Sequence, residues 1–177
     1  MAAPEVHGAR DPGDSAIGII RDFLTFLAKM GLTVRDDPKK VVDIAGRPWG
    51  EPVDGIALSM QLRPKEDPDE LPAVSVAIRN VGATKRVLRT RGWVDFFNVT
   101  VRDASGRDAE LTSYGRELLK PENAQAHAEV ELEPGEATEA DIPIGSIYRM
   151  KGMYRVQATC RTPEDGRAVS NEVEVSA

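Results

Sequence analysis

Hydrophobic residues recur every three to four positions near the start of the chain, which predicts an amphipathic α-helix over residues 14–31 that ends at Gly31. The apolar stripe of this helix consists of Ile17, Ile20, Phe23, Leu24, Leu27 and Met30. Because Ile19 and Phe26 widen the stripe, the helix has more apolar surface than a lone solvated helix should expose. We therefore expect it to dock on its own domain, on a partner protein, on a second copy of the chain or on a membrane surface.

Further along, the hydrophobic period changes from 3.6 to two, which predicts half-buried β-strands. The residues expected to point inward are Ile56, Leu58, Met60 and Leu62; Val74, Val76 and Ile78; Phe97, Val99 and Val101; Val130 and Leu132; Tyr154, Val156 and Ala158; Val173 and Val175. Between these runs, DASGRD, EPGEA and PEDGRA contain the Gly and Pro-Gly residues that tight turns need. Several short antiparallel strands joined by turns predict a sandwich or a barrel.

One late turn has a more specific pattern. In IYRMKGMYRV, Gly152 is expected to adopt a positive φ or tight-turn conformation at the entrance to the strand that contains Tyr154. Tyr148 and Tyr154 flank this corner as aromatic packing residues. A corner tyrosine near a late strand is a feature of immunoglobulin-like sandwiches.

Five motifs occur in one order along the chain: AIRNVG (77–82), VTVRDASGRD (99–108), LEPGE (132–136), IYRMKGMYRV (147–156) and VSNEVEV (169–175). In this order they resemble the bacterial immunoglobulin-like domains that include the intracellular proteinase inhibitor (BsuPI-like) group and sandwich domains attached to some secreted metallopeptidases. The resemblance does not cover the N-terminal helix. It implies a non-catalytic binding or accessory module, and it identifies no inhibitory residue in this sequence.

The fold expectation is therefore all-β: an immunoglobulin-like antiparallel β-sandwich over residues 50–177, with one N-terminal amphipathic α-helix. Residues 1–13 are expected to form a disordered leader, because they are rich in Pro and Gly and have no hydrophobic period. Residues 32–49 are expected to form a linker with at most one short strand or turn.

The formal net charge of -6 and the pI near 5.1 disfavour a nucleic-acid partner and an anionic membrane surface, which both need a basic face. The most apolar segment is interrupted by charges and is too short to span a membrane. The first residues also lack a secretory signal pattern. We expect a cytoplasmic protein if the given start is native, and an extracytoplasmic one if it is not.

Few residues offer catalytic or metal-binding chemistry. Cys160 is the only cysteine, and His7 and His127 are the only histidines, so one chain cannot supply the usual zinc ligands. Cys160 follows Ala158 by two positions on a predicted strand, which indicates a small buried residue rather than a nucleophile. We expect no enzyme activity, no catalytic residues and no cofactor.

Three charged or aromatic stretches are candidate binding sites. The acidic residues of DASGRD resemble part of a calcium loop, but a hairpin turn is the ordinary interpretation. Glu129, Glu131 and Glu133 share one strand face and are expected to be exposed and solubilising. The stretch KRVLRTRGW places Arg89 and Arg91 beside Trp93, where they could bind an acidic partner, although a solvated strand or loop that balances nearby acids is the ordinary interpretation.

The sequence thus predicts a protein-interaction module that binds a protein partner of unknown identity. The expected interaction surface consists of Ile17, Ile20, Phe23, Leu24, Leu27, Arg89, Arg91 and Trp93. The helix could also mediate homo-oligomer formation. Two alternatives stay open: a peptidase inhibitor of the BsuPI-like type, which only the resemblance implies, and a sandwich that binds carbohydrate or calcium.

Overall fold

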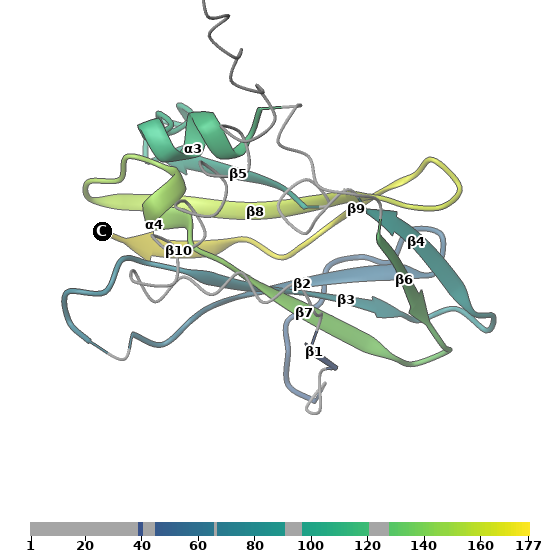
Figure 1. Ribbon diagram of the computed structural model, residues 1–177. Helices are drawn as coiled ribbons and strands as arrows, with labels where there is room; N and C mark the ends of the chain where they lie inside the picture. The colour runs from purple at the N-terminus through teal and green to yellow at the C-terminus, as the bar shows by residue number, and fades with distance from the viewer. Residues whose placement is uncertain (1–38, 41–44, 66, 91–96, 121–127) are drawn as a thin grey trace, which may run out of the picture. The chain divides into compact units, whose positions relative to one another are not determined.

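The computed structural model describes residues 39–40, 45–65, 67–90, 97–120 and 128–177, and most of their regular structure is β-strand (Figure 1). The strands are β1 (Lys39–Lys40), β2 (Ile56–Leu62), β3 (Val74–Asn80), β4 (Arg86–Thr90), β5 (Asn98–Asp103), β6 (Ala128–Leu132), β7 (Ala137–Ile142), β8 (Met153–Arg161), β9 (Arg167–Val169) and β10 (Val173–Ser176). The helices α3 (Ser113–Leu118) and α4 (Ile144–Ile147) are short. The predicted leader 1–13 and helix 14–31 lie outside the described residues.

All the strand pairings among the described residues are antiparallel. The first sheet has the order β1-β7-β3-β2, and the second has the order β10-β8-β5, with β9 also paired to β8. Strands β4 and β6 form a separate two-stranded ribbon. Strand β1 lies within the predicted linker 32–49. In the described part of the chain, no helix is long and apolar enough to cross a membrane.

The two sheets enclose one apolar core in a sandwich-like arrangement (Figure 1). Its buried side chains include Ile56, Leu58, Met60, Val74, Val76 and Ile78 from the first sheet, Val101, Val156, Ala158 and Val175 from the second, and Phe97 directly before β5. Leu88, Val130 and Leu132 of the ribbon join the same cluster. The predicted alternation is confirmed at these positions. It is wrong at Leu62, which is 47% exposed because it lies at the end of β2.

The prediction that every strand is half-buried is also wrong for β2. Its outward residues Ala57 and Ser59 are buried like the inward ones. The cause lies in the preceding segment, because Trp49 forms a β-bridge with Ser59 and packs against Ala77 and Ala137 on the outer face of the first sheet. Small side chains make room for the indole ring, so Trp49 is a packing residue.

The turns mostly follow the sequence prediction. Gly106 in DASGRD and Gly135 in EPGEA have positive φ values, as tight turns require. In PEDGRA the residue with positive φ is instead Asp165, at 63°. Gly166 is required there for a different reason, since a Cβ atom at this position would lie 2.2 Å from an oxygen of Asp54.

The side chain of Asn80 is fully buried at the end of β3, and each of its polar atoms has a partner. Its Nδ2 donates to the carbonyls of Thr84 (2.8 Å) and Leu132 (2.9 Å), and its Oδ1 accepts from the backbone N–H of Gly82 (2.9 Å). Asn80 therefore connects β3, the following loop and the end of β6 with three hydrogen bonds.

A pair of adjacent polar residues, Ser170 and Asn171, joins the two sheets. The side chain of Asn171 accepts from the backbone N–H of Met60 (2.8 Å) and donates to the carbonyl of Met60 (2.9 Å) on β2. The hydroxyl of Ser170, which is also buried, accepts from the backbone N–H of Ala158 (3.0 Å) on β8. Consecutive residues thus bind one strand of each sheet.

Replacing Asn80 with Ala is expected to lower the free energy of unfolding by about 3 kcal/mol, because the change leaves buried backbone groups without partners. Urea unfolding at neutral pH measures the loss. Asn98→Ala is the matched control, since Asn98 is exposed on β5 and its replacement should cost less than about 0.5 kcal/mol. Equal stability of the two variants would contradict the structural role of Asn80.

Candidate functional site

The structure describes one of the eight residues predicted to form the interaction surface, Arg89. The others lie outside the described residues: Ile17, Ile20, Phe23, Leu24, Leu27, Arg91 and Trp93. The predicted helix surface and the aromatic part of the basic stretch therefore stay predictions.

Arg89 lies on β4, and its charge is balanced by the acidic strand β6. The register places Arg89 opposite Glu129, and Arg89 Nε lies 3.2 Å from Glu129 Oε1. Lys85 forms ion pairs with Glu131 and Glu133 in the same way. Arg89 is 82% exposed, so its pair contributes little to stability. The interpretation of the basic stretch as a solvated strand that balances nearby acids is confirmed for Lys85 and Arg89.

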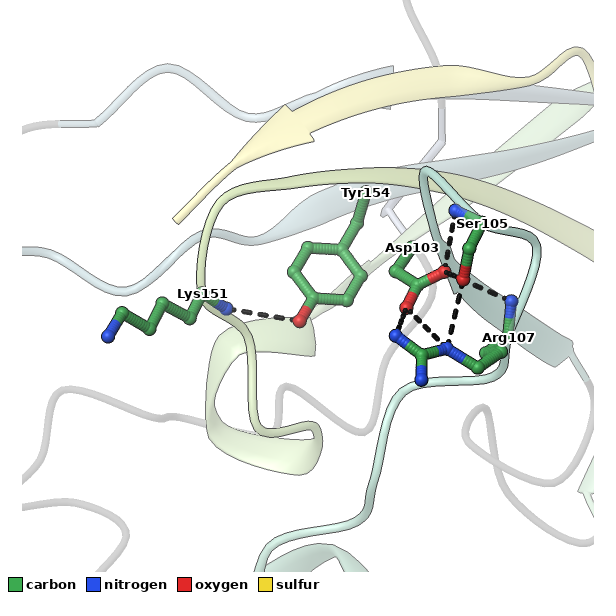
Figure 2. Close-up of polar contacts among 5 residues, drawn as sticks. All are labelled: Asp103, Ser105, Arg107, Lys151 and Tyr154. Carbon is green, nitrogen blue, oxygen red and sulfur yellow. Dashed lines mark hydrogen bonds and ion pairs between the residues drawn. The ribbon is translucent and has the colours of Figure 1, made fainter.

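The turn after β5 is organised by the carboxylate of Asp103 (Figure 2). Its Oδ1 accepts from the backbone N–H of Ser105 (2.8 Å), the Ser105 hydroxyl (2.6 Å) and the backbone N–H of Arg107 (3.1 Å). Its Oδ2 accepts from Arg107 Nε (3.2 Å). The hydrogen bond from Ser105 is the largest of the effects that lower the pKa of Asp103 to about 2. The interpretation of DASGRD as a turn is confirmed. Both oxygens of the Asp103 carboxylate accept hydrogen bonds within this turn.

The two corner tyrosines also have hydrogen bonds that hold the backbone in place. Gly152 has the expected positive φ of 94°. The hydroxyl of Tyr148 donates to the carbonyl of Val99 (2.9 Å), and the hydroxyl of Tyr154 accepts from the backbone N–H of Lys151 (3.2 Å; Figure 2). Burial raises the pKa of Tyr148, which keeps its donating proton in place. Both rings also pack against the core, as the sequence predicts.

Cys160 is buried on β8, with 3% of its surface exposed. Burial raises the pKa of its thiol to about 12, so the thiolate that would act as a nucleophile is scarce near neutral pH. The interpretation of Cys160 as a small buried residue is confirmed. His7 and His127 lie outside the described residues.

In the part of the chain that the structure describes, neither a large ligand cavity nor a metal-binding group of side chains is prominent. A mainly apolar hollow of about 190 Å³ lies between β5 and the two short helices, where Phe97, Ile147 and Tyr148 line it. Small-molecule sites usually measure about 300–1,000 Å³, so this hollow is small for a ligand. Among the described residues, no group of three or more His, Cys, Asp or Glu side chains could hold a metal ion.

The described residues thus define a mostly β domain with antiparallel sheets and only short helices. No protein-family model and no curated protein match the chain. Among solved structures, a mutant beta-glucosidase from Listeria innocua in complex with laminaribiose is similar, with 20% sequence identity and a TM-score of 0.34. The match covers 69% of this chain and only 16% of that chain. A similarity this low carries neither an activity nor a ligand over to this chain.

The structure of the Asp103 turn predicts a pH-dependent contribution to stability. The pKa of Asp103 is about 2 in the folded protein, and its ordinary value is 3.8. The ionised carboxylate therefore stabilises the fold at pH values above 3.8. This contribution should be lost as the pH falls from about 4 to about 2. The urea midpoint of the wild type should exceed that of Asp103→Asn by a constant amount near neutral pH, and the gap should narrow in this acidic range.

Asp69→Asn is the control for this prediction, because Asp69 is exposed in a different loop. Its urea midpoint should stay close to that of the wild type at each pH. A gap for Asp103→Asn that stays constant down to about pH 2 would show that the carboxylate does not stabilise the turn through its charge.

The burial of Cys160 predicts that the native protein resists thiol reagents. At pH 8 a chromogenic disulfide reagent should react at least about 1,000-fold more slowly than it does in denaturing urea, because reaction requires the core to open. The chain has one cysteine, so the entire signal comes from Cys160. Rapid reaction without urea would mean that the thiol is accessible in the folded protein.

Proposed function

We propose that this chain is a non-catalytic protein-interaction module built on an immunoglobulin-like antiparallel sandwich. The strand order is the observation that carries the proposal. Strands β2, β3 and β7 are neighbours in one sheet, and β5, β8 and β10 are neighbours in the other. This order corresponds to strands A, B and E against C, F and G of immunoglobulin-like domains. Such domains present surfaces and loops for binding, although a fold alone does not define a function.

The corner tyrosine supports the same assignment. Tyr154 lies at the start of β8, the counterpart of strand F, and its hydroxyl bonds to the backbone three residues upstream at Lys151. A tyrosine in this position with a bond of this kind is a hallmark of the fold. The described polar residues Asp103, Tyr148 and Tyr154 are all hydrogen-bonded to nearby backbone, which supports a structural role for them.

The chain itself covers parts of two strands where a partner could otherwise pair. On β2, the side chain of Asn171 bonds to both backbone polar groups of Met60. On β5, the carbonyl of Val101 accepts from the backbone N–H of Ala109 (2.8 Å). These contacts limit the addition of a partner strand at both places. They favour docking through loops or through the apolar stripe of the predicted helix, and we propose the stripe residues Ile17, Ile20, Phe23, Leu24 and Leu27 as the main contact.

Co-purification with the tagged full-length chain tests this function. Leu24→Asp places a charge on the apolar stripe, and Thr25→Asp places the same charge on the opposite face of the predicted helix. A bound protein, or a second copy of the chain, should be retained by Thr25→Asp and lost from Leu24→Asp and from a chain lacking residues 1–32. A partner that binds all three variants equally would rule out the helix as the docking element.

Inhibition of a peptidase is the second candidate function. Only the resemblance of the five motifs to the BsuPI-like group suggests it. The hydrogen bond from Asn80 of AIRNVG to Leu132 of LEPGE links two of these motifs in the scaffold and identifies no inhibitory residue. Titration against a panel of serine peptidases and metallopeptidases tests it. Inhibition at nanomolar concentration would support this function, and inactivity against the whole panel would exclude it for those enzymes.

A further inference from the structure

Two Asp-Gly pairs occur in the chain, and both lie in tight turns: Asp54-Gly55 directly before β2, and Asp165-Gly166 between β8 and β9 (Figure 1). Both aspartates have positive φ, 50° at Asp54 and 63° at Asp165. Aspartate followed by glycine is the sequence most prone to isomerise, because a residue without Cβ leaves its backbone nitrogen unhindered for attack on the preceding carboxyl group. The two pairs are therefore chemically alike, and their surroundings decide which one reacts.

Isomerisation begins when the glycine nitrogen attacks Cγ of the aspartate side chain and forms a new C–N bond. One carboxyl oxygen leaves as water together with the carboxyl proton and the amide proton, and the product is a five-membered succinimide ring. Solvent water then adds to the main-chain carbonyl of the ring and breaks the bond from its carbon to the glycine nitrogen. The chain now continues through Cγ, as isoaspartate. Water is the only co-reactant, and nothing is oxidised or reduced.

The Asp165-Gly166 pair is open to this reaction. Asp165 is exposed, and its carboxylate has no hydrogen bond or ion pair with any described residue. The backbone N–H of Gly166 likewise has no acceptor among the described residues. In this three-residue hairpin loop, the backbone N–H of Asp165 donates to the carbonyl of Thr162 (3.1 Å), and Asp165 takes the left-handed position that usually belongs to glycine. Both reacting groups are thus without competing hydrogen bonds.

The Asp54-Gly55 pair is held from several sides. Asp54 is half-buried, and its carboxylate accepts a hydrogen bond from the hydroxyl of Thr162. The carbonyl of Gly55 accepts from the backbone N–H of Val81 (2.8 Å). Ring closure at this pair would have to break the contact with Thr162 and rotate a backbone that the other bond fixes. It therefore requires the turn to open locally, which slows the reaction.

We propose that Asp165 is a site of spontaneous isomerisation to isoaspartate in the folded protein, and that the fold protects Asp54 from the same reaction. This inference goes beyond the proposed function, because it concerns a covalent change of the chain that needs no partner.

The modification acts on a contact between the turn and the start of β2. Gly166 packs so closely on the Asp54 carboxylate that a Cβ atom at position 166 would overlap it. Isoaspartate adds one atom to the main chain directly beside this contact. The added atom displaces the carbonyl of Gly166, which in the unmodified turn accepts from the backbone N–H of Thr162 (2.9 Å). We therefore expect the modified protein to unfold at a lower urea concentration.

Ageing of the full-length chain tests the proposal. Folded protein is kept at pH 7.4 and 37 °C for several weeks, and a second sample is kept unfolded in guanidinium chloride. Trypsin then releases Asp165 in the peptide 162–167 and Asp54 in the peptide 41–65, since the enzyme does not cleave before proline. Isoaspartate leaves the mass unchanged, so synthetic standards identify the modified peptides by retention time, and electron-transfer fragmentation locates the modified residue.

In the folded sample, isoaspartate at Asp165 should exceed isoaspartate at Asp54 at least about tenfold, because only the second pair must open before it reacts. In guanidinium chloride both pairs lose their contacts, so the two rates should agree within about threefold. The comparison separates the effect of the fold from the effect of the local sequence.

Variants test the two environments separately. Asp165→Glu should give no isomer in the peptide 162–167, because glutamate would have to close a six-membered ring, and its urea midpoint should not fall on ageing. Thr162→Val removes the hydroxyl that holds the Asp54 carboxylate and should raise isomerisation at Asp54 at least about fivefold. Thr159→Val makes the same change within β8 and should leave the rate at Asp54 as in the wild type. Circular dichroism checks that each variant is folded.

Three results would overturn the proposal: no isoaspartate at Asp165 in the folded sample, the same ratio of the two sites in folded and unfolded samples, or a rate at Asp54 that Thr162→Val leaves unchanged. None of these results depends on the N-terminal stripe, so a failure here is separate from a failure of the proposed function.

Discussion

A single buried amide, that of Asn80, fixes the end of the first sheet against the ribbon. Its side chain binds the backbone at Gly82, Thr84 and Leu132, and its own backbone N–H and carbonyl bind the turn at Glu136 and Gly135. A buried polar network stabilises a fold only when its members are satisfied, because a half-paired amide is worse than an apolar side chain. The five bonds of Asn80 meet this condition. They also explain why two motifs about fifty residues apart in the sequence act as one unit.

The joint between the sheets depends on the same physical principle. A strand ladder extends a sheet sideways, but it cannot tie two stacked sheets together, so side chains must do this. The side-chain amide of Asn171 forms two hydrogen bonds to the backbone of Met60, as a residue of a neighbouring strand would. The adjacent Ser170 bonds to β8. The Ser-Asn motif near the C-terminus is thereby explained by structure. In this chain, the short polar motifs around Asn80 and Ser170 are parts of a scaffold.

How much of this structure the sequence predicts depends on how clearly each strand separates polar from apolar residues. Strand β8 alternates cleanly, and β3 does so except at the buried Ala77, so the inward residues of both strands are correctly predicted. The hydrophobic pattern does not predict strand β7, because ATEADI places small and polar residues on both of its faces and so has no period of two. For the ion pairs between β4 and β6, the sequence predicts only that the basic stretch balances nearby acidic residues. The partner of Arg89 depends on a pairing between distant segments, and no local pattern contains that information.

The position of Trp49 also depends on contacts between distant segments, which no local pattern predicts, and Trp49 covers part of the outer face of the first sheet. The Trp49 ring packs on Ala77 and Ala137, which belong to strands far apart in the sequence. Only the sheet register therefore reveals this contact. Elsewhere in the core the polar groups of Asn80 and Ser170 are satisfied, as stability requires. The donors of Trp49 and Arg79 are not satisfied within the described residues, and this lowers stability. Arg86 Nε on β4 of the ribbon is a further buried donor without a partner, so unpaired donors are not confined to this face and each one lowers stability where it occurs.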